Sequence, residues 1–144
     1  MTTPFYSADC AAGSGIQPRA GIGLCSVSGS YTMLAAFLDE DIVHLGKMPK
    51  GATLLEVILD VPALTDQADV TWDLGDSDSS GRFITAGTAG RSSAGAIVRL
   101  TLAGGSQYVY TADNTIQFKI KTVPGATAVT DGTIKLTAIY TMDP

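Results

Sequence analysis

The chain of 144 residues has the length of one domain, and only 16% of its residues are charged, below the roughly 25% usual for soluble domains. The net charge is −5 and the nine Lys and Arg residues are scattered singly, so we expect no nucleic-acid partner. The longest apolar run is interrupted by Glu56 and Asp60, so we expect no membrane span, and the N-terminus shows no secretory signal. The low charge fits an ordinary β-sandwich and also a protein that covers part of its surface with a partner.

The N-terminal segment, residues 1–29, is rich in Gly, Ala and Ser and has no sustained hydrophobic period. This composition predicts an irregular arm, followed by a β-sandwich domain over residues 30–144. The arm is more apolar than most free tails, so we expect it to dock along the domain or onto a neighbouring molecule. Cys10 and Cys25 both lie in the arm; a disulfide between them stays open, although reduced thiols are the default expectation without a secretory signal.

Short β segments follow, separated by turn signals such as Asp131-Gly132. Residues 31–38 suit a helix as well as a strand. Further along, Ile116, Phe118 and Ile120 alternate with polar residues, which is typical of a half-buried strand. The strands expected after residue 38 cover residues 42–48, 53–61, 68–74, 96–102, 107–111, 115–122 and 132–141. About eight strands at roughly ten-residue spacing predict an all-β antiparallel sandwich that is jelly-roll-like.

The run WDLGDSDSSGRF, residues 72–83, resembles both a calcium loop and a tight turn. Asp76 and Asp78 could supply the first and third ligands of an EF-hand loop, but its twelfth position is Gly87 instead of a bidentate Glu. An irregular calcium site stays open. The preferred interpretation is a surface turn in which Asp and Ser side chains bond nearby amides, with solvated carboxylates and Arg82 paired to one acid. Asp73 is expected on the solvent face of the preceding strand, opposite Trp72 and Leu74.

The chain offers no convincing catalytic or metal-binding constellation. His44, the one histidine, lies within a predicted strand, and no Gly-x-Ser-x-Gly motif supplies a nucleophile for it. Cys10, Cys25 and His44 are too few and too dispersed for a zinc site. The acidic clusters fall in turns, where carboxylates are normally ionised and solvated. The residues therefore predict a protein that is not an enzyme and that has no cofactor, metal or catalytic residue.

From Ser30 onward, the chain resembles the small decoration (cement) or head-fibre proteins of tailed-bacteriophage capsids. The resemblance rests on ordered phrases that span about four-fifths of the chain: FLDEDIVHLGKMPKGATLLEVILDV, WDLGDSDSSGRFI, YTADNTIQFKI and GTIKLTAIYTMD. It implies a β-sandwich, often a jelly roll, that assembles in the host cytoplasm and sits on the outer surface of the virion. The implied partners are the major capsid protein and further copies of the chain, as a homotrimer in preference to a homodimer.

An apolar arm could cross a protomer boundary and order only on binding. Under this interpretation, the candidate capsid or protomer contacts all lie in the arm: Phe5, Tyr6, Ile16, Arg19, Ile22 and Leu24. The competing interpretation is that these residues cover the chain's own sandwich.

Two alternative functions follow from other residues. A virion-surface module could recognise host glycans if Trp72, Tyr108 and Tyr110 formed an aromatic platform beside the Asp-rich turn, although Trp72 falls on the apolar face of its strand, which favours burial in the core. A hydrolase using His44 or Asp76 ranks far below both binding functions.

Overall fold

The computed structural model describes residues 4–6, 24–35, 37–65, 69–92, 94–101, 107–122 and 131–142. These residues form strands and turns, and none of them is helical; accordingly, the described part contains no helix that could cross a membrane. The strands are β1 Pro4–Tyr6, β2 Leu24–Thr32, β3 Ile42–Met48, β4 Ala52–Val61, β5 Thr71–Asp76, β6 Ile84–Gly87, β7 Ala96–Thr101, β8 Tyr108–Val109, β9 Asn114–Thr122 and β10 Thr133–Met142.

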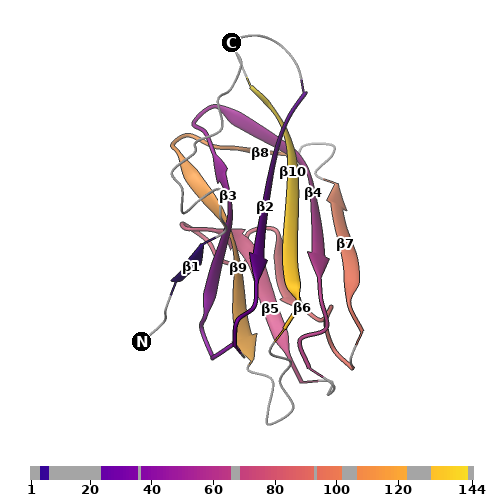
Figure 1. The fold of residues 1–144 in the computed structure, drawn as a ribbon. Coiled ribbons are helices and arrows are strands. Elements are labelled where there is room, and N and C mark those ends of the chain that lie inside the picture. Colours follow the sequence, from indigo (N-terminus) through magenta and orange to yellow (C-terminus); the bar gives the residue numbers. More distant parts are fainter. Residues whose placement is uncertain are drawn as a thin grey trace.

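The strands form two sheets that pack face to face (Figure 1). The first sheet has the order β1-β3-β9-β5-β6, and the second has the order β2-β10-β4-β7, with β8 paired to β4. Every pair is antiparallel except β1 with β3. Most connections cross from one sheet to the other, as in a jelly roll. The predicted all-β antiparallel sandwich is confirmed.

The core lies between the two sheets, and its large apolar side chains come from alternate positions along the strands. In β9, Ile116, Phe118 and Ile120 are fully buried, as their spacing predicts. Trp72 of β5 is 1% exposed and lies 5.0 Å from Phe118, ring centre to ring centre. Buried apolar area of this kind stabilises a domain by roughly 25 cal/mol per Å². The core therefore fixes which face of each strand is left to meet solvent or a partner.

The second sheet begins earlier than the sequence predicts. Residues 24–29, expected in the irregular arm, belong to β2 and pair with β10 along its length. The reason is that buried and exposed positions alternate here among small residues. Val27 and Gly29 are buried, whereas Ser26 and Ser28 are exposed. The alternation of bulky apolar and polar residues that usually indicates a strand is therefore missing from this segment. A predicted irregular segment ending at residue 29 is thus wrong for residues 24–29, and β1 is a further strand within it.

Residues 31–38, ambiguous between helix and strand, are neither throughout. Tyr31 and Thr32 end β2, and the described residues that follow form a loop leading to β3. That loop is closed by Glu40, whose φ of 67° lies in the left-handed region that turns require.

Candidate functional site

The predicted arm contacts are only partly placed by the structure. The backbone of β1 pairs parallel with β3, so that Phe5 lies opposite Val43 and Tyr6 opposite His44, at the edge of the first sheet. Leu24 opens β2 in the other sheet and is 73% exposed. The structure does not bring Leu24 and β1 onto one sheet. The remaining predicted contacts lie outside the described residues: Ile16, Arg19 and Ile22. Cys10 also lies outside them, so the structure does not test whether Cys10 and Cys25 form a disulfide or stay reduced.

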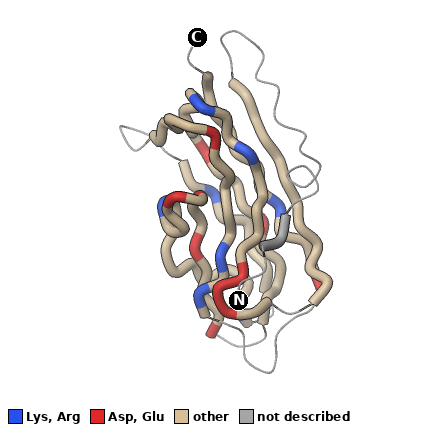
Figure 2. Tube along the Cα trace, turned by 90° about the vertical axis from the view of Figure 1, so that its left-hand side faces the viewer, with Lys and Arg blue, Asp and Glu red and all other residues tan. Residues whose placement is uncertain are grey.

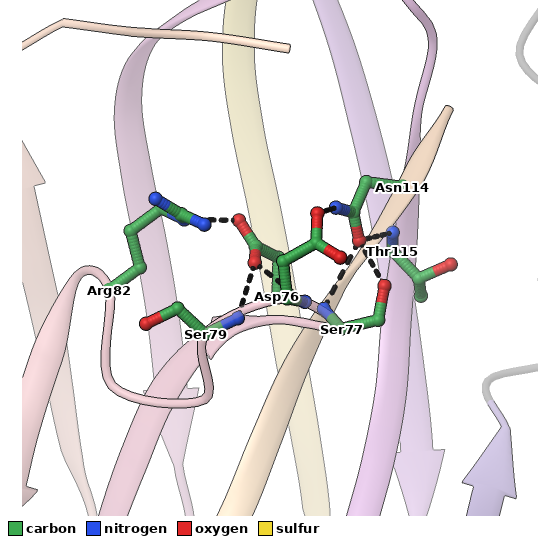
Figure 3. Close-up of polar contacts among 7 residues, drawn as sticks. Asp76, Ser77, Ser79, Arg82, Asn114 and Thr115 are labelled. Carbon is green, nitrogen blue, oxygen red and sulfur yellow. Dashed lines mark hydrogen bonds and ion pairs between the residues drawn. The ribbon is translucent and has the colours of Figure 1, made fainter. Parts of the chain in front are cut away.

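The acidic run after Trp72 is a tight turn with a buried carboxylate at its base. Asp76, the last residue of β5, is 1% exposed. Its Oδ1 accepts the amide N–H groups of Asp78 (3.1 Å) and Ser79 (2.9 Å), and its Oδ2 accepts the Nε–H of Arg82 at 2.6 Å (Figure 3). The expectation of a solvated carboxylate is wrong for Asp76, because backbone amides and a guanidinium replace its water. The predicted turn and the pairing of Arg82 with an acid are confirmed.

Asn114 joins this turn to β9. Its Oδ1 accepts the amide N–H groups of Ser77 (3.1 Å) and Thr115 (2.7 Å) and the hydroxyl of Ser77, while its Nδ2 donates to Asp78 at 2.8 Å (Figure 3). One amide side chain thus satisfies groups in the turn after β5 and in β9. No group of three or more His, Cys, Asp or Glu side chains that could hold a metal ion is found among the described residues.

Asp73 is also buried, contrary to its expected place on the solvent face. It is 4% exposed, its Oδ1 accepts the amide N–H of Ala86 at 2.9 Å, and Lys121 Nζ lies 3.9 Å from its Oδ2. The physical reason is β6, a short strand that pairs with β5 and brings its amide over the carboxylate. The alternation of β5 predicts the direction in which Asp73 points but does not predict that another strand covers it.

An aromatic cluster backs the turn. The Arg82 guanidinium lies 4.1 Å from the centre of the Tyr108 ring, and the Tyr108 and Tyr110 rings meet edge to face at 4.8 Å. Trp72 donates its indole N–H to the carbonyl of Ala89 at 2.9 Å. Trp72 and Tyr110 are each 1% exposed, and Arg82 stacks on Tyr108. These rings therefore belong to the core and its edge, and they do not form the open platform that a sugar site needs.

The burial of Tyr110 predicts a loss of stability in alkali. Burial first, and then the charge of Asp76, raise the pKa of Tyr110 above its ordinary value of 10.0. The folded state thus holds the phenol proton at a pH where the unfolded state has released it, so this contribution is complete below pH 10.0 and falls above it. Tyr110→Phe should be nearly neutral at pH 7, because no described group hydrogen-bonds the hydroxyl. Urea unfolding above pH 10 should show a shallower fall for the variant, and an unchanged slope would contradict the prediction.

A shallow groove of about 430 Å³ lies beside the turn and is lined by Lys47, Met48, Pro49, Ser77, Asp113, Asn114 and Thr115. Its polar groups already hold the local backbone: Asp113 accepts the amide N–H of Lys50 at 2.8 Å, and Asn114 is engaged as described above. No aromatic ring is among the lining residues. His44, half-buried in β3 with a pKa lowered by burial, pairs in register with Gln117 and is not among the lining residues either.

Several large apolar side chains are exposed at separate places on the described surface. Exposed large hydrophobic side chains are Leu24, Leu34, Leu38, Ile97 and Val109. Figure 2 shows the charged residues interspersed between uncharged stretches, with no continuous basic band in the described part of the chain. Of these positions, only Leu24 is among the contacts that the sequence predicts. A signal was present for Ile97, because it shares a strand face with Arg99 and Thr101.

Two of these side chains, Leu34 and Leu38, belong to described residues between β2 and β3. Met33 and Phe37 are 3% and 4% exposed and anchor the loop, whereas Leu34 and Leu38 are 87% and 66% exposed. The Leu38 amide donates to the Asp41 carboxylate at 2.7 Å, and the Asp41 amide donates to the Leu38 carbonyl at 3.2 Å. These bonds hold Leu38 in the turn before β3, which lowers the ordering cost of binding at this side chain.

Solved structures with the same fold come from phage capsids. A chain in the capsid of Ralstonia phage GP4 is 25% identical, with a TM-score of 0.73 over 99% of this chain and 99% of that chain. A chain in the capsid asymmetric unit of Cyanophage Pam1 is 20% identical, with a TM-score of 0.73 over 90% of this chain and 91% of that chain. No family model matches the chain, and no curated protein matches it.

The neighbour from the Ralstonia phage GP4 capsid indicates a structural, non-enzymatic β-sandwich protein. More particularly, it supports a phage capsid-related protein that is a component of the virion.

Proposed function

We propose that the chain is a decoration (cement) protein, which binds the outer surface of a tailed-phage capsid and stabilises contacts between subunits of the major capsid protein. The observation that carries the proposal is the end-to-end similarity to a chain in the Ralstonia phage GP4 capsid, which covers 99% of both chains. The two chains therefore correspond over nearly their whole lengths. A small β-sandwich suits a protein that binds to an assembled shell, because it presents a preformed surface and needs no conformational change to bind.

The described surface supports binding to another protein. Leu34 and Leu38 are exposed between β2 and β3. Burial of exposed leucine side chains in a protein interface is favourable, because it removes apolar surface from water. The neighbouring turn carries Asp39, which is exposed, and Glu40, which pairs with Lys119. An apolar tip with an acidic margin fits an apolar recess between capsid subunits with a basic rim.

The predicted arm contacts keep their place in the proposal. Phe5 and Tyr6 lie at the edge of the first sheet, where an arm could reach a neighbouring subunit, and Leu24 adds an exposed apolar side chain to the second sheet. With Ile16, Arg19 and Ile22, these residues are proposed as capsid or protomer contacts in an assembly made in the host cytoplasm.

The mechanism is thermodynamic. A protein that binds the assembled shell better than its separate subunits stabilises the shell by mass action. A contact of about 800 Å² per partner is enough for specific binding. Several copies bound as a homo-oligomer would repeat this contact across the symmetric lattice.

The test is to add the purified protein to undecorated capsids and measure binding by co-sedimentation and capsid heat resistance by calorimetry. We expect saturable binding and a higher disassembly temperature. The double variant Leu34→Ser/Leu38→Ser should bind about tenfold more weakly or worse, because two apolar contacts are lost. Val109→Ser, at an exposed apolar position on β8, is the matched control and should bind normally.

The outcomes are decisive for the proposal. Absence of binding by the folded wild-type protein at saturating concentration would exclude the decoration function. Equal binding by both variants would retain that function and exclude the β2–β3 loop as the contact.

A further inference from the structure

The free edge of β7 is open in the described structure. β7 is the outermost strand of the second sheet, at the right of Figure 1, and pairs with β4 on one side. None of the described strands pairs with its other side. An edge of this kind presents unpaired N–H and C=O groups that can extend the sheet into another chain.

Apart from one charged residue, Arg99, β7 lacks the usual devices that protect an edge. It spans six residues, contains no Pro, and pairs with β4 in a regular register without a bulge. By contrast, β6 at the edge of the first sheet has four residues, a register irregularity against β5, and Ala86 at a φ of 55°. Irregularity of this sort discourages edge pairing, so the edge of β7 is better suited to it than that of β6. β2, the other edge of the second sheet, is also regular, but apart from Leu24 its exposed side chains are Ser and Thr, so pairing there would cover less apolar surface.

Both faces of β7 carry apolar side chains that its own domain does not cover fully. Ile97, on the outer face, is 71% exposed. Val98 and Leu100, on the inner face, are only half-buried. Arg99 is the one charged residue of the strand, and its Nε lies 3.1 Å from Glu56 Oε1. A strand added beside β7 would cover apolar surface on both faces.

The charges on the neighbouring strand favour a second copy of β7 as that added strand. On β4, Asp60 lies beside Ile97 and Ile58 beside Arg99. Antiparallel pairing of two β7 strands about a two-fold axis at Val98 places Ile97 opposite the second copy's Arg99. The second copy's Arg99 then lies two strands away from Asp60 of the first copy. The two backbones are roughly 10 Å apart, a distance that the two side chains can span.

Other registers are less favourable. Moving the axis to Arg99 places two arginines directly opposite each other, which is destabilising. Moving it to Ile97 shortens the ladder and takes Arg99 away from the second copy's Ile97. The apolar and charged positions of β7 and β4 are therefore self-complementary in one register.

We propose that two copies of the chain associate through their β7 edges, antiparallel and with Val98 at the axis, to form one continuous sheet. The pair is isologous, with each Arg99 between Glu56 of its own chain and Asp60 of the other. This geometry gives a dimer in place of the trimer preferred from the sequence. The inference deepens the proposed function, since it names the surface through which copies associate, and it rests on that function only for its role on the capsid.

The experiment is multi-angle light scattering and sedimentation of the isolated full chain. The wild-type mass should be twice 14.8 kDa. Ile97→Lys places a cation opposite the second copy's Arg99 and should give a monomer. Leu34→Lys, which removes a comparably exposed apolar side chain elsewhere, should remain a dimer. Circular dichroism verifies that each variant is folded.

A second pair of variants tests the register. Asp60→Asn removes the charge expected to meet the second copy's Arg99 and should raise the dimer dissociation constant. Glu56→Gln removes only the partner within the chain and should leave that constant nearly unchanged.

A monomeric wild type, a trimer, or a dimer that survives Ile97→Lys would overturn the inference, and equal weakening by Asp60→Asn and Glu56→Gln would overturn the register. A dimer that fails to bind capsids would instead count against the decoration function alone.

Discussion

Replacement of Asp76 by alanine is expected to lower the free energy of unfolding by about 3 kcal/mol, one of the two largest effects predicted for a single side chain here. Both carboxylate oxygens are used inside the fold, by the amides of Asp78 and Ser79 and by Arg82. The alanine variant leaves two amide N–H groups and a partly buried guanidinium without their acceptor. Urea unfolding at neutral pH measures the loss.

The matched control is Asp78→Ala, in the same turn. Asp78 is exposed, and its carboxylate makes one surface hydrogen bond to Asn114. Its removal should cost less than about 1 kcal/mol. Equal losses for the two variants would show that the turn is stabilised by its acidity in general and not by the buried carboxylate.

Gly75→Ala is the second large effect, with an expected loss of about 3 kcal/mol or failure to fold. A Cβ at this position would lie 2.0 Å from the carbonyl oxygen of Ser79 and 2.5 Å from backbone atoms of Ser80. These are backbone atoms, so the turn itself must open to accept the methyl group. Opening the turn also separates Ser79 from Asp76, and the buried carboxylate loses its donors.

Gly81→Ala, six residues further along, is the comparison. There the nearest atom to a new Cβ is Thr85 Cγ2 at 3.3 Å, at the end of a side chain that can rotate. We expect a change within about 1 kcal/mol by thermal denaturation. If Gly75→Ala were tolerated equally well, the close packing of the turn on the end of β5 would be wrong.

The strand pattern was readable from the sequence where bulky residues alternate. The predicted segment 42–48 has the same bounds as β3, and the segments at 53–61, 96–102, 115–122 and 132–141 match strands to within one residue at each end. Pro49 and Gly51, with a φ of 89°, end β3 and form the turn to β4. Strands that alternate in Ser and Gly, such as β2, or that are very short, such as β6, carry no such signal.

The buried turn was not readable, because its character depends on contacts between distant parts of the chain. In the sequence, Asp76 and Asp73 both resemble solvated acids. In the fold, Arg82 and the turn amides surround the Asp76 carboxylate, and β6 covers the Asp73 carboxylate. Asn114 reaches the turn from 36 residues away. The exposed leucines were hidden for the converse reason: Leu34 and Leu38 suggest a core segment, but Met33 and Phe37 occupy the core instead.

The placement of β10 between β2 and β4 has a consequence for biosynthesis. Leu24 pairs with Thr141 and Thr32 with Thr133, so among the described strands β2 has no partner in its sheet until β10 has left the ribosome. Pairings between such distant residues carry a high loop-closure cost and fold slowly. In nascent chains that lack β10, the edges of both β2 and β4 are open to aberrant association. Folding of the second sheet should therefore be completed only after β10 has been synthesised.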